Sequence, residues 1–129
     1  MDQASAERLI RGVFHEGTST PNPPDVLAKL FHSDFVCHGP PGVNHAHAEG
    51  AEPIENCIFG GAFEELVFSV GEVEVEGDRL VGHFEATGRQ VAEFQGVAAT
   101  NETRVVEGVT TFRVQDGKLA EGWGILAWR

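Results

Sequence analysis

The sequence predicts an α+β fold, in which three N-terminal helices pack on a strongly curved antiparallel or mixed sheet and form a cone around an apolar pocket. Two observations predict it. Apolar residues recur at helical spacing in the first half of the chain, and the second half alternates with period two between turn signals. The chain has 129 residues, 41% of them hydrophobic, which suits one domain with a core and a cavity. We therefore expect residues 1–129 to form a single domain.

Three segments are predicted to be helical. The first spans residues 4–15, where apolar and charged side chains take opposite faces. The apolar face consists of Leu9, Ile10, Val13 and Phe14, and the charged face consists of Glu7, Arg8 and Arg11. Asp25 follows two prolines and can cap a short second helix. A short strand over Asp34–His38 precedes the third helix, which is expected over Glu52–Phe63.

Four longer strands follow and are expected to form a meander. They span Leu66–Glu76, Arg79–Thr87, Glu102–Val114 and Lys118–Trp128. Gly77-Asp78 is the turn signal between the first two of these strands. Asp116-Gly117 joins the last two, and Asp-Gly is among the strongest short hairpin signals. The second hairpin is therefore the clearest local prediction in the chain.

Charge and composition exclude several classes of partner and cofactor. The formal net charge is −11, which disfavours binding to nucleic acid or to an anionic membrane surface. No signal peptide or membrane-spanning apolar run is recognisable, and two cysteines do not predict a disulfide framework, so we expect a cytoplasmic protein. We expect no cofactor, since no phosphate-binding loop or dinucleotide fingerprint occurs. We also expect no metal, because His45-x-His47 has no nearby Asp or Cys to complete a site.

Short segments in a fixed order resemble the SnoaL-like polyketide cyclases of the nuclear transport factor 2-like superfamily. These segments are Ser33-Asp34-Phe35-Val36-Cys37-His38-Gly39-Pro40, Gly60-Gly61-Ala62-Phe63, Glu76-Gly77-Asp78-Arg79-Leu80-Val81, Thr87-Gly88, Gly108-Val109, Phe112-Arg113-Val114-Gln115-Asp116-Gly117-Lys118-Leu119 and Glu121-Gly122-Trp123. The resemblance implies ring closure of a polyketide ester by an intramolecular aldol reaction, without cofactor or metal. It also implies a pocket acid or base, usually an Asp shortly after the tryptophan. Ala127 stands at that position here.

Other residues must then handle the proton. His38 matches a position where the family commonly keeps a His, and it is the main candidate base. His83 and Glu85 lie two apart on a strand and so share a face, which allows a carboxylate to orient a base. Glu107 is a further catalytic candidate, placed either in the pocket or on the outer face. The expected substrate-binding residues are Phe35, Phe63, Trp123 and Ile125.

The face that His83 occupies depends on the register of its hairpin. If Gly77-Asp78 is a two-residue turn, Glu76 pairs with Arg79 and His83 joins the solvated face of Glu72, Glu74 and Glu76. If the turn holds one more residue as a bulge, His83 instead shares the inward face of Val73 and Val75. The sequence leaves both registers open.

The expected function is cyclisation or isomerisation of an apolar small molecule, such as a polyketide or a similar secondary metabolite. The pocket would hold the substrate in a reactive conformation, and acid and base groups would move protons. One alternative is an epoxide or ester hydrolase, or a hydroxylase-type member of the same fold. Another is a non-catalytic small-molecule-binding module, with no ionisable side chain reaching into its pocket. Proteins of this kind commonly dimerise through the outer face of the sheet, so we expect a homodimer.

Overall fold

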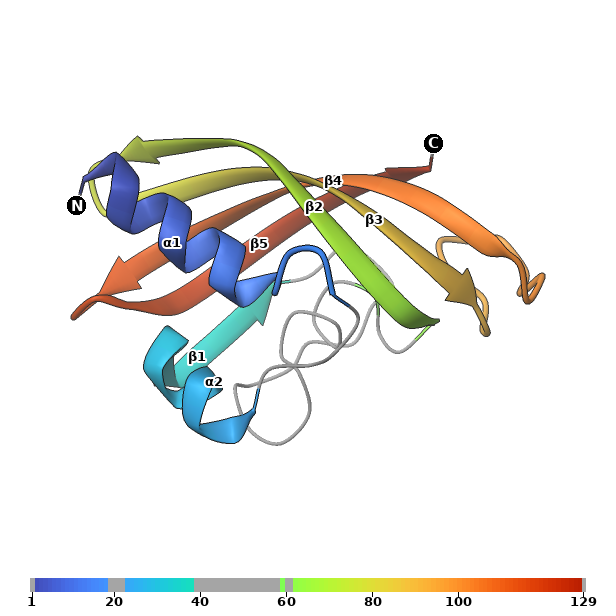
Figure 1. Ribbon diagram of the computed structural model, residues 1–129, viewed down its shortest axis with the longest axis horizontal. Helices are drawn as coiled ribbons and strands as arrows, with labels where there is room; N and C mark the ends of the chain where they lie inside the picture. Colours follow the sequence, from blue (N-terminus) through green and yellow to red (C-terminus); the bar gives the residue numbers. More distant parts are fainter. Residues whose placement is uncertain (1, 19–22, 39–58, 60–61, 129) are drawn as a thin grey trace.

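The computed structural model describes residues 2–18, 23–38, 59 and 62–128, which form two helices and one five-stranded sheet (Figure 1). The elements are α1 (Gln3–Val13), α2 (Pro24–Leu30), β1 (Phe31–His38), β2 (Phe63–Glu76), β3 (Arg79–Gln90), β4 (Thr103–Gln115) and β5 (Lys118–Trp128). The strand order is β1-β5-β4-β3-β2. β1 pairs with β5 in parallel, and all other neighbours are antiparallel. The fold is therefore α+β with a strongly curled mixed sheet, as the sequence predicts.

The helices form for local reasons and pack on the inner face of the sheet. The Asp2 side chain caps α1 by accepting a hydrogen bond from the Ser5 backbone N–H at 2.9 Å. Ile10 and Val13 of α1 are fully buried. The first turn of α2 differs from the prediction, because its N-cap is Pro23 and Asp25 lies inside the helix. Pro24 stands at the first helical position, where its missing N–H leaves no donor unpaired and its fixed φ favours the start of a helix.

The predicted third helix, Glu52–Phe63, lies mostly outside the described residues. Its last residue, Phe63, is the first residue of β2 rather than the end of a helix. Cys37 is buried on β1 and is disulfide-bonded, a bond that the sequence did not predict. Neither helix in the described part of the chain is long and apolar enough to cross a membrane.

Both hairpin turns have two residues. Gln115 pairs with Lys118, and Asp116 and Gly117 have φ values of 55° and 75°, the left-handed conformation that an Asp-Gly turn of this type requires. Glu76 pairs with Arg79 across the other turn. The first of the two open registers is therefore the observed one. A bulge follows further along β2, where the register shifts between Val70 and Val73.

Phenylalanine fills the space between the helices and the sheet. All nine phenylalanines of the chain are described, and none is more than 6% exposed. Their rings form two clusters of contacts. In the larger one, for example, Phe14 lies against Phe68 at 5.0 Å and against Phe84 at 4.7 Å between ring centroids. The smaller cluster consists of Phe31, Phe35 and Phe112. Gly108 makes room for this packing, because a Cβ there would lie 2.7 Å from Phe84 Cε1. The inner face is thus a packed aromatic core over most of its described length.

Candidate functional site

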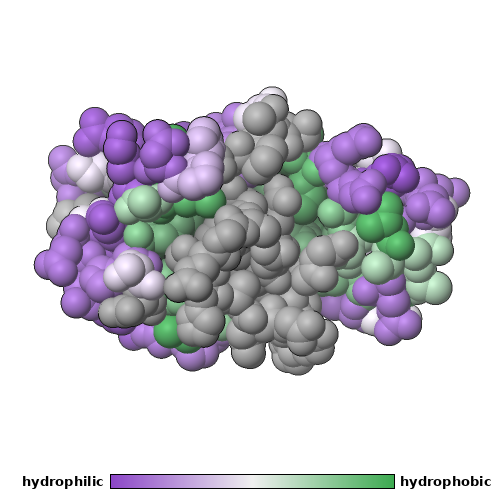
Figure 2. Space-filling view, turned by 90° about the horizontal axis from the view of Figure 1, so that it is seen from below, coloured by the Kyte–Doolittle hydropathy of each residue, from purple (hydrophilic) through white to green (hydrophobic). Residues whose placement is uncertain are grey.

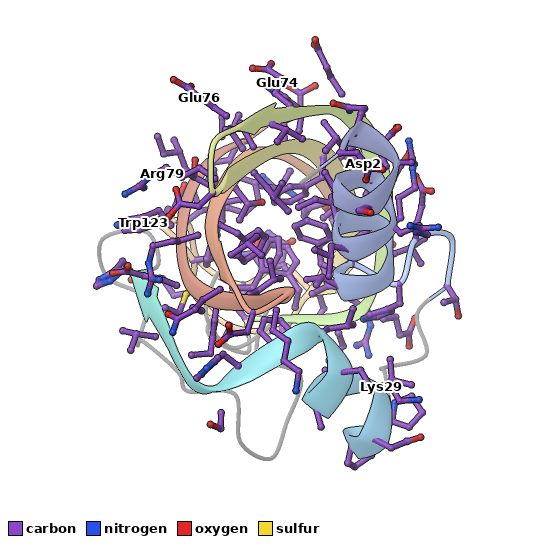
Figure 3. The ribbon with its side chains drawn as sticks, turned by 90° about the vertical axis from the view of Figure 1, so that its left-hand side faces the viewer. Asp2, Lys29, Glu74, Glu76, Arg79 and Trp123 are labelled. Atoms are coloured by element: carbon purple, nitrogen blue, oxygen red, sulfur yellow. The ribbon has the colours of Figure 1, made fainter. Side chains whose placement is uncertain are left out.

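Most of the predicted site residues lie on the outer face of the sheet. Strand residues alternate between faces, and on β5 the buried Gly122 and Leu126 alternate with the more exposed Glu121, Trp123 and Ile125. Figure 3 looks along the curled sheet and shows Trp123 and Arg79 outside it, whereas other side chains fill the inside. Trp123 is therefore not a wall of the interior.

His38 and Trp123 are brought together at the pairing of β1 with β5. They are register partners, and the imidazole stacks on the indole with ring centroids 5.3 Å apart and an interplanar angle of 17°. The Arg79 guanidinium carbon lies 4.9 Å from the centre of the same indole. β1 and β3 lie on opposite sides of β5 in the sheet, so the indole is held between a histidine and an arginine.

Glu121 connects His38 with Arg113. Its carboxylate accepts a hydrogen bond from His38 Nε2 at 2.7 Å and one from Arg113 Nε at 3.1 Å. The hydrogen bond from His38, followed by the one from Arg113, lowers the pKa of Glu121 below its usual value. The carboxylate is thus ionised at neutral pH and fixes the orientation of the imidazole. A histidine oriented by a carboxylate is chemically suited to act as a base.

Four predicted site residues meet in one groove across β2, β3, β4 and β5. His83, Glu85, Glu107 and Ile125 line this outer groove of about 550 Å³. The other lining residues are Ser69, Gly71, Phe84, Gly108, Val109, Leu126 and Ala127. Glu85 and Glu107 are direct cross-strand partners, and Ile125 is 75% exposed. The outer groove therefore combines three titratable side chains with an unusually exposed apolar one.

One set of side chains in the described part of the chain could hold a metal ion. Donor atoms of Glu72, Glu74 and His83 all lie within 4.8 Å of one another on the outer face. His83 Nε2 is 3.5 Å from Glu74 Oε1. Tetrahedral zinc with ligands at about 2.0–2.1 Å would separate its donors by about 3.4 Å, so these exposed side chains would need only small movements. The predicted pair His45 and His47 lies outside the described residues.

The remaining predicted residues, Phe35 and Phe63, belong to the core. Phe35 is fully buried against Phe31, with ring centroids 4.7 Å apart. Phe63 packs against Phe94 and Trp128 at 5.4 Å and 6.0 Å. Both side chains point to the inner face, as the sequence predicts. The ring contacts given above pack them against other aromatic side chains.

A second cavity, which the sequence analysis did not identify, lies where the two hairpins meet the helices. This hairpin-end pocket has a volume of about 670 Å³ and is lined by Ser5, Arg8, Leu9, Leu30, Gly77, Asp78, Val114 and Gly117. It is at the end of the molecule drawn on the left in Figures 1 and 2, where hydrophobic surface shows between hydrophilic residues. Leu9, Leu30 and Val114 give it an apolar floor. The two turns were recognisable in the sequence, but nothing in it placed them beside Arg8.

His15 is a further feature that no sequence pattern indicated. It follows α1 with a φ of 36° and is only 8% exposed. Its ring meets Phe68 edge-on, with centroids 6.1 Å apart. Burial lowers the pKa of His15 below its usual value of 6.5, so the imidazole is neutral at pH 7. Among the described residues, His15 is the one buried histidine, and the other buried polar side chains are Gln90 and Thr110.

Comparison with solved structures reports the same fold over nearly the whole chain. TsrD from Streptomyces laurentii is 24% identical, with a TM-score of 0.70 over 98% of this chain and 90% of that one. A candidate SnoaL-like polyketide cyclase from Jannaschia sp. CCS1 is 23% identical, with a TM-score of 0.72 over the same shares. AclR, a candidate hydroxylase from Streptomyces galilaeus, is 22% identical, with a TM-score of 0.68 over 99% of this chain and 82% of that one.

At these identities the structural likenesses establish the fold alone. No curated protein matches the sequence significantly. The family model described as the SnoaL-like domain, however, matches residues 7–122, which is most of the chain. The strand order, the curled sheet and the family model agree, and the chain therefore belongs to the SnoaL-like domain family.

Proposed function

We propose that this SnoaL-like domain is a cofactor-independent cyclase or isomerase that acts on an apolar, polyketide-like small molecule in the hairpin-end pocket. The observation that carries the proposal is the composition of this pocket. An apolar floor of Leu9, Leu30 and Val114 lies below polar groups from Ser5, Arg8 and Asp78. Small-molecule sites typically measure about 300–1,000 Å³ and combine apolar walls with a few polar groups, and this pocket of about 670 Å³ fits that description.

Asp78 is the proposed proton acceptor in this pocket. In an intramolecular aldol closure, a base takes a proton from a carbon beside a carbonyl group. The resulting enolate carbon bonds to a second carbonyl carbon, and the alkoxide that forms takes a proton back. One carboxylate can serve both proton transfers, and holding the flexible chain in a folded conformation supplies much of the remaining acceleration. The similarity to candidate polyketide cyclases supports this class of reaction.

The test is turnover of a linear polyketide, followed by mass spectrometry and NMR of the product. Asp78→Asn should lower the rate by about 10²–10⁴-fold, the usual contribution of a general base. Asp116→Asn is the matched control, because it makes the same change in the other hairpin turn. Unchanged turnover in Asp78→Asn would show that Asp78 is not the base.

The outer groove supports a second candidate, hydrolysis of an epoxide or an ester. The observation that favours it is that His83, Glu85 and Glu107 line one groove. His38, oriented by Glu121, is a further proposed base on this face. Reaction in ¹⁸O-labelled water separates the two candidates, because hydrolysis incorporates the label and ring closure does not. His83→Gln, compared with His32→Gln, would then show whether the groove carries the chemistry.

We propose further that the outer face pairs with a second copy of the chain. Ile125 is 75% exposed and Val36 is 39% exposed on this face, and covering such side chains is favourable. Ile125→Glu should convert a dimer to a monomer in sedimentation or light scattering, whereas Ala92→Glu on an exposed loop should not. If Ile125→Glu leaves the mass unchanged, the outer face is not the dimer interface.

A further inference from the structure

Arg8 differs from every other arginine in the described part of the chain. Arg11, Arg89 and Arg113 each lie within 4.0 Å of a carboxylate oxygen. Arg79 and Arg104 each lie over a tryptophan ring, at 4.9 Å and 4.8 Å from its centre. Arg8 makes neither kind of contact. Its one side-chain hydrogen bond is donated to Ser5 Oγ at 3.2 Å.

This guanidinium is therefore largely uncommitted in a strongly acidic protein. The chain has 20 acidic and 9 basic residues, so a carboxylate partner would be easy to find. Asp2 is engaged in capping α1 through its hydrogen bond from the Ser5 N–H. The hydrogen bonds from Ser5, and to a smaller extent the charge of Arg8, lower the pKa of Asp2, but the two side chains form no ion pair within 4.0 Å. A guanidinium carries five N–H donors, and one donated bond leaves most of them for a ligand.

Arg8 lies at the hairpin-end pocket, whose floor is apolar. We infer that this pocket takes a ligand with an apolar body and a single carboxylate group, and that Arg8 binds the carboxylate. The planar fork of a guanidinium matches a carboxylate with two parallel hydrogen bonds. This inference rests on the proposed function and specifies its substrate as an apolar carboxylic acid, with Arg8 as the residue that selects and orients it.

The charges around the pocket favour a monoanion over a more highly charged ligand. Asp78 lines the same pocket, and Asp2 lies on the same turn of α1 as Ser5. The net charge of −11 adds a general repulsion of anions. A phosphate ester would bring about two negative charges to these carboxylates, whereas a carboxylate brings one. Arg8 can compensate one charge.

The test compares naphthalene-1-acetate with its methyl ester at pH 7, since the two differ mainly in the negative charge. Binding is measured by calorimetry, and the amide NMR signals of Gly77 and Gly117 report whether the ligand is in the pocket. The acid should bind at least about 10-fold more tightly than the ester, as expected for a charge-assisted hydrogen-bonded pair. Arg8→Gln should remove this preference, so that the acid and the ester bind with similar affinity. Arg8→Lys should retain part of it, because the charge remains.

Arg89→Gln is the matched control, since Arg89 is also on the surface but pairs with Glu64 away from the pocket. It should keep the full preference for the acid. Equal binding of acid and ester to the unmodified protein would overturn the inference and leave the apolar pocket of the proposed function intact. A preference for the acid that survives in Arg8→Gln would also overturn it. If neither compound shifts the Gly77 and Gly117 signals, both the inference and the proposed pocket fail.

Discussion

The inner and outer faces of the sheet carry different chemistry, although their residues alternate along the same strands. On β3, burial alternates without a break from Leu80 to Gln90. The inward positions between these two residues hold only apolar residues or glycine: Gly82, Phe84, Ala86 and Gly88. The outward positions hold Val81, His83, Glu85, Thr87 and Arg89. Each strand thus separates its packing residues from its titratable residues.

This difference explains where proton-handling groups can come from. The inner face is filled by phenylalanine, so a charged strand residue would have to displace an aromatic ring and lose its hydration. Titratable side chains that reach the interior or the hairpin-end pocket must then come from helices, their ends and the turns. His15 follows α1, and Asp78 lies in the turn between β2 and β3. Both residues lie outside the alternating pattern of the strands.

The largest expected difference between the two faces is in the free energy of unfolding that is lost when one aromatic ring is removed from each face. Phe68→Ala should lower the free energy of unfolding by about 3–5 kcal/mol, because Phe68 is fully buried among three other phenylalanine rings. Trp123→Ala should cost much less, because the indole is partly exposed. Urea denaturation followed by far-UV circular dichroism measures both. Equal losses would mean that the outer face contributes to stability as the core does.

A smaller effect is expected from adding one methyl group to each face. A Cβ at Gly108 would lie 2.7 Å from Phe84 Cε1 and 2.8 Å from Leu126 Cδ2. Gly108→Ala should therefore destabilise the protein by about 1–3 kcal/mol through overpacking. At Gly71, which faces outward, a Cβ would meet only the His83 backbone oxygen at 3.6 Å, an ordinary contact. Gly71→Ala should be nearly neutral in the same denaturation experiment, and a comparable loss there would contradict the distinction.

The smallest expected effect is on the pH dependence of stability, and it comes from the buried His15. Burial lowers the pKa of folded His15, so the unfolded chain binds more protons as the pH falls through 6.5. This group therefore adds stability above that pH and loses it below. His15→Asn should therefore flatten the decline in stability between pH 7 and pH 5, measured by urea denaturation at each pH. Parallel curves for His15→Asn and the unmodified protein would show that His15 does not contribute.

Much of the fold could be predicted because it depends on local patterns. The alternation in Leu66–Glu76 and the Asp116-Gly117 turn determine strands and a hairpin through near neighbours in the sequence. The boundaries were less certain, and Phe63 is an example. It was expected to end a helix, but it begins β2, because an aromatic residue next to glycines fits either element.

The site was harder to predict because it depends on which face each residue takes and on distant neighbours. His38 and Trp123 were both predicted as site residues, but their stacking depends on the parallel pairing of β1 with β5, which no local pattern encodes. The location of His83 followed from one turn whose length the sequence left open. The position of Arg8 beside two hairpin turns depends on how α1 lies on the sheet, and no local pattern encodes that angle.

The parallel pairing of β1 with β5 has a consequence for how the chain reaches its fold during synthesis. Residue 38 pairs with residue 123, so the strand that pairs with β1 among the described residues emerges from the ribosome only after β2, β3 and β4. Until then Phe31 and Phe35 lack the strand that holds their segment in place. Such distant pairings slow folding, because a long loop must close before any contact rewards it. We expect the last strand to act as the closing step, in which a partly collapsed chain becomes a complete sheet.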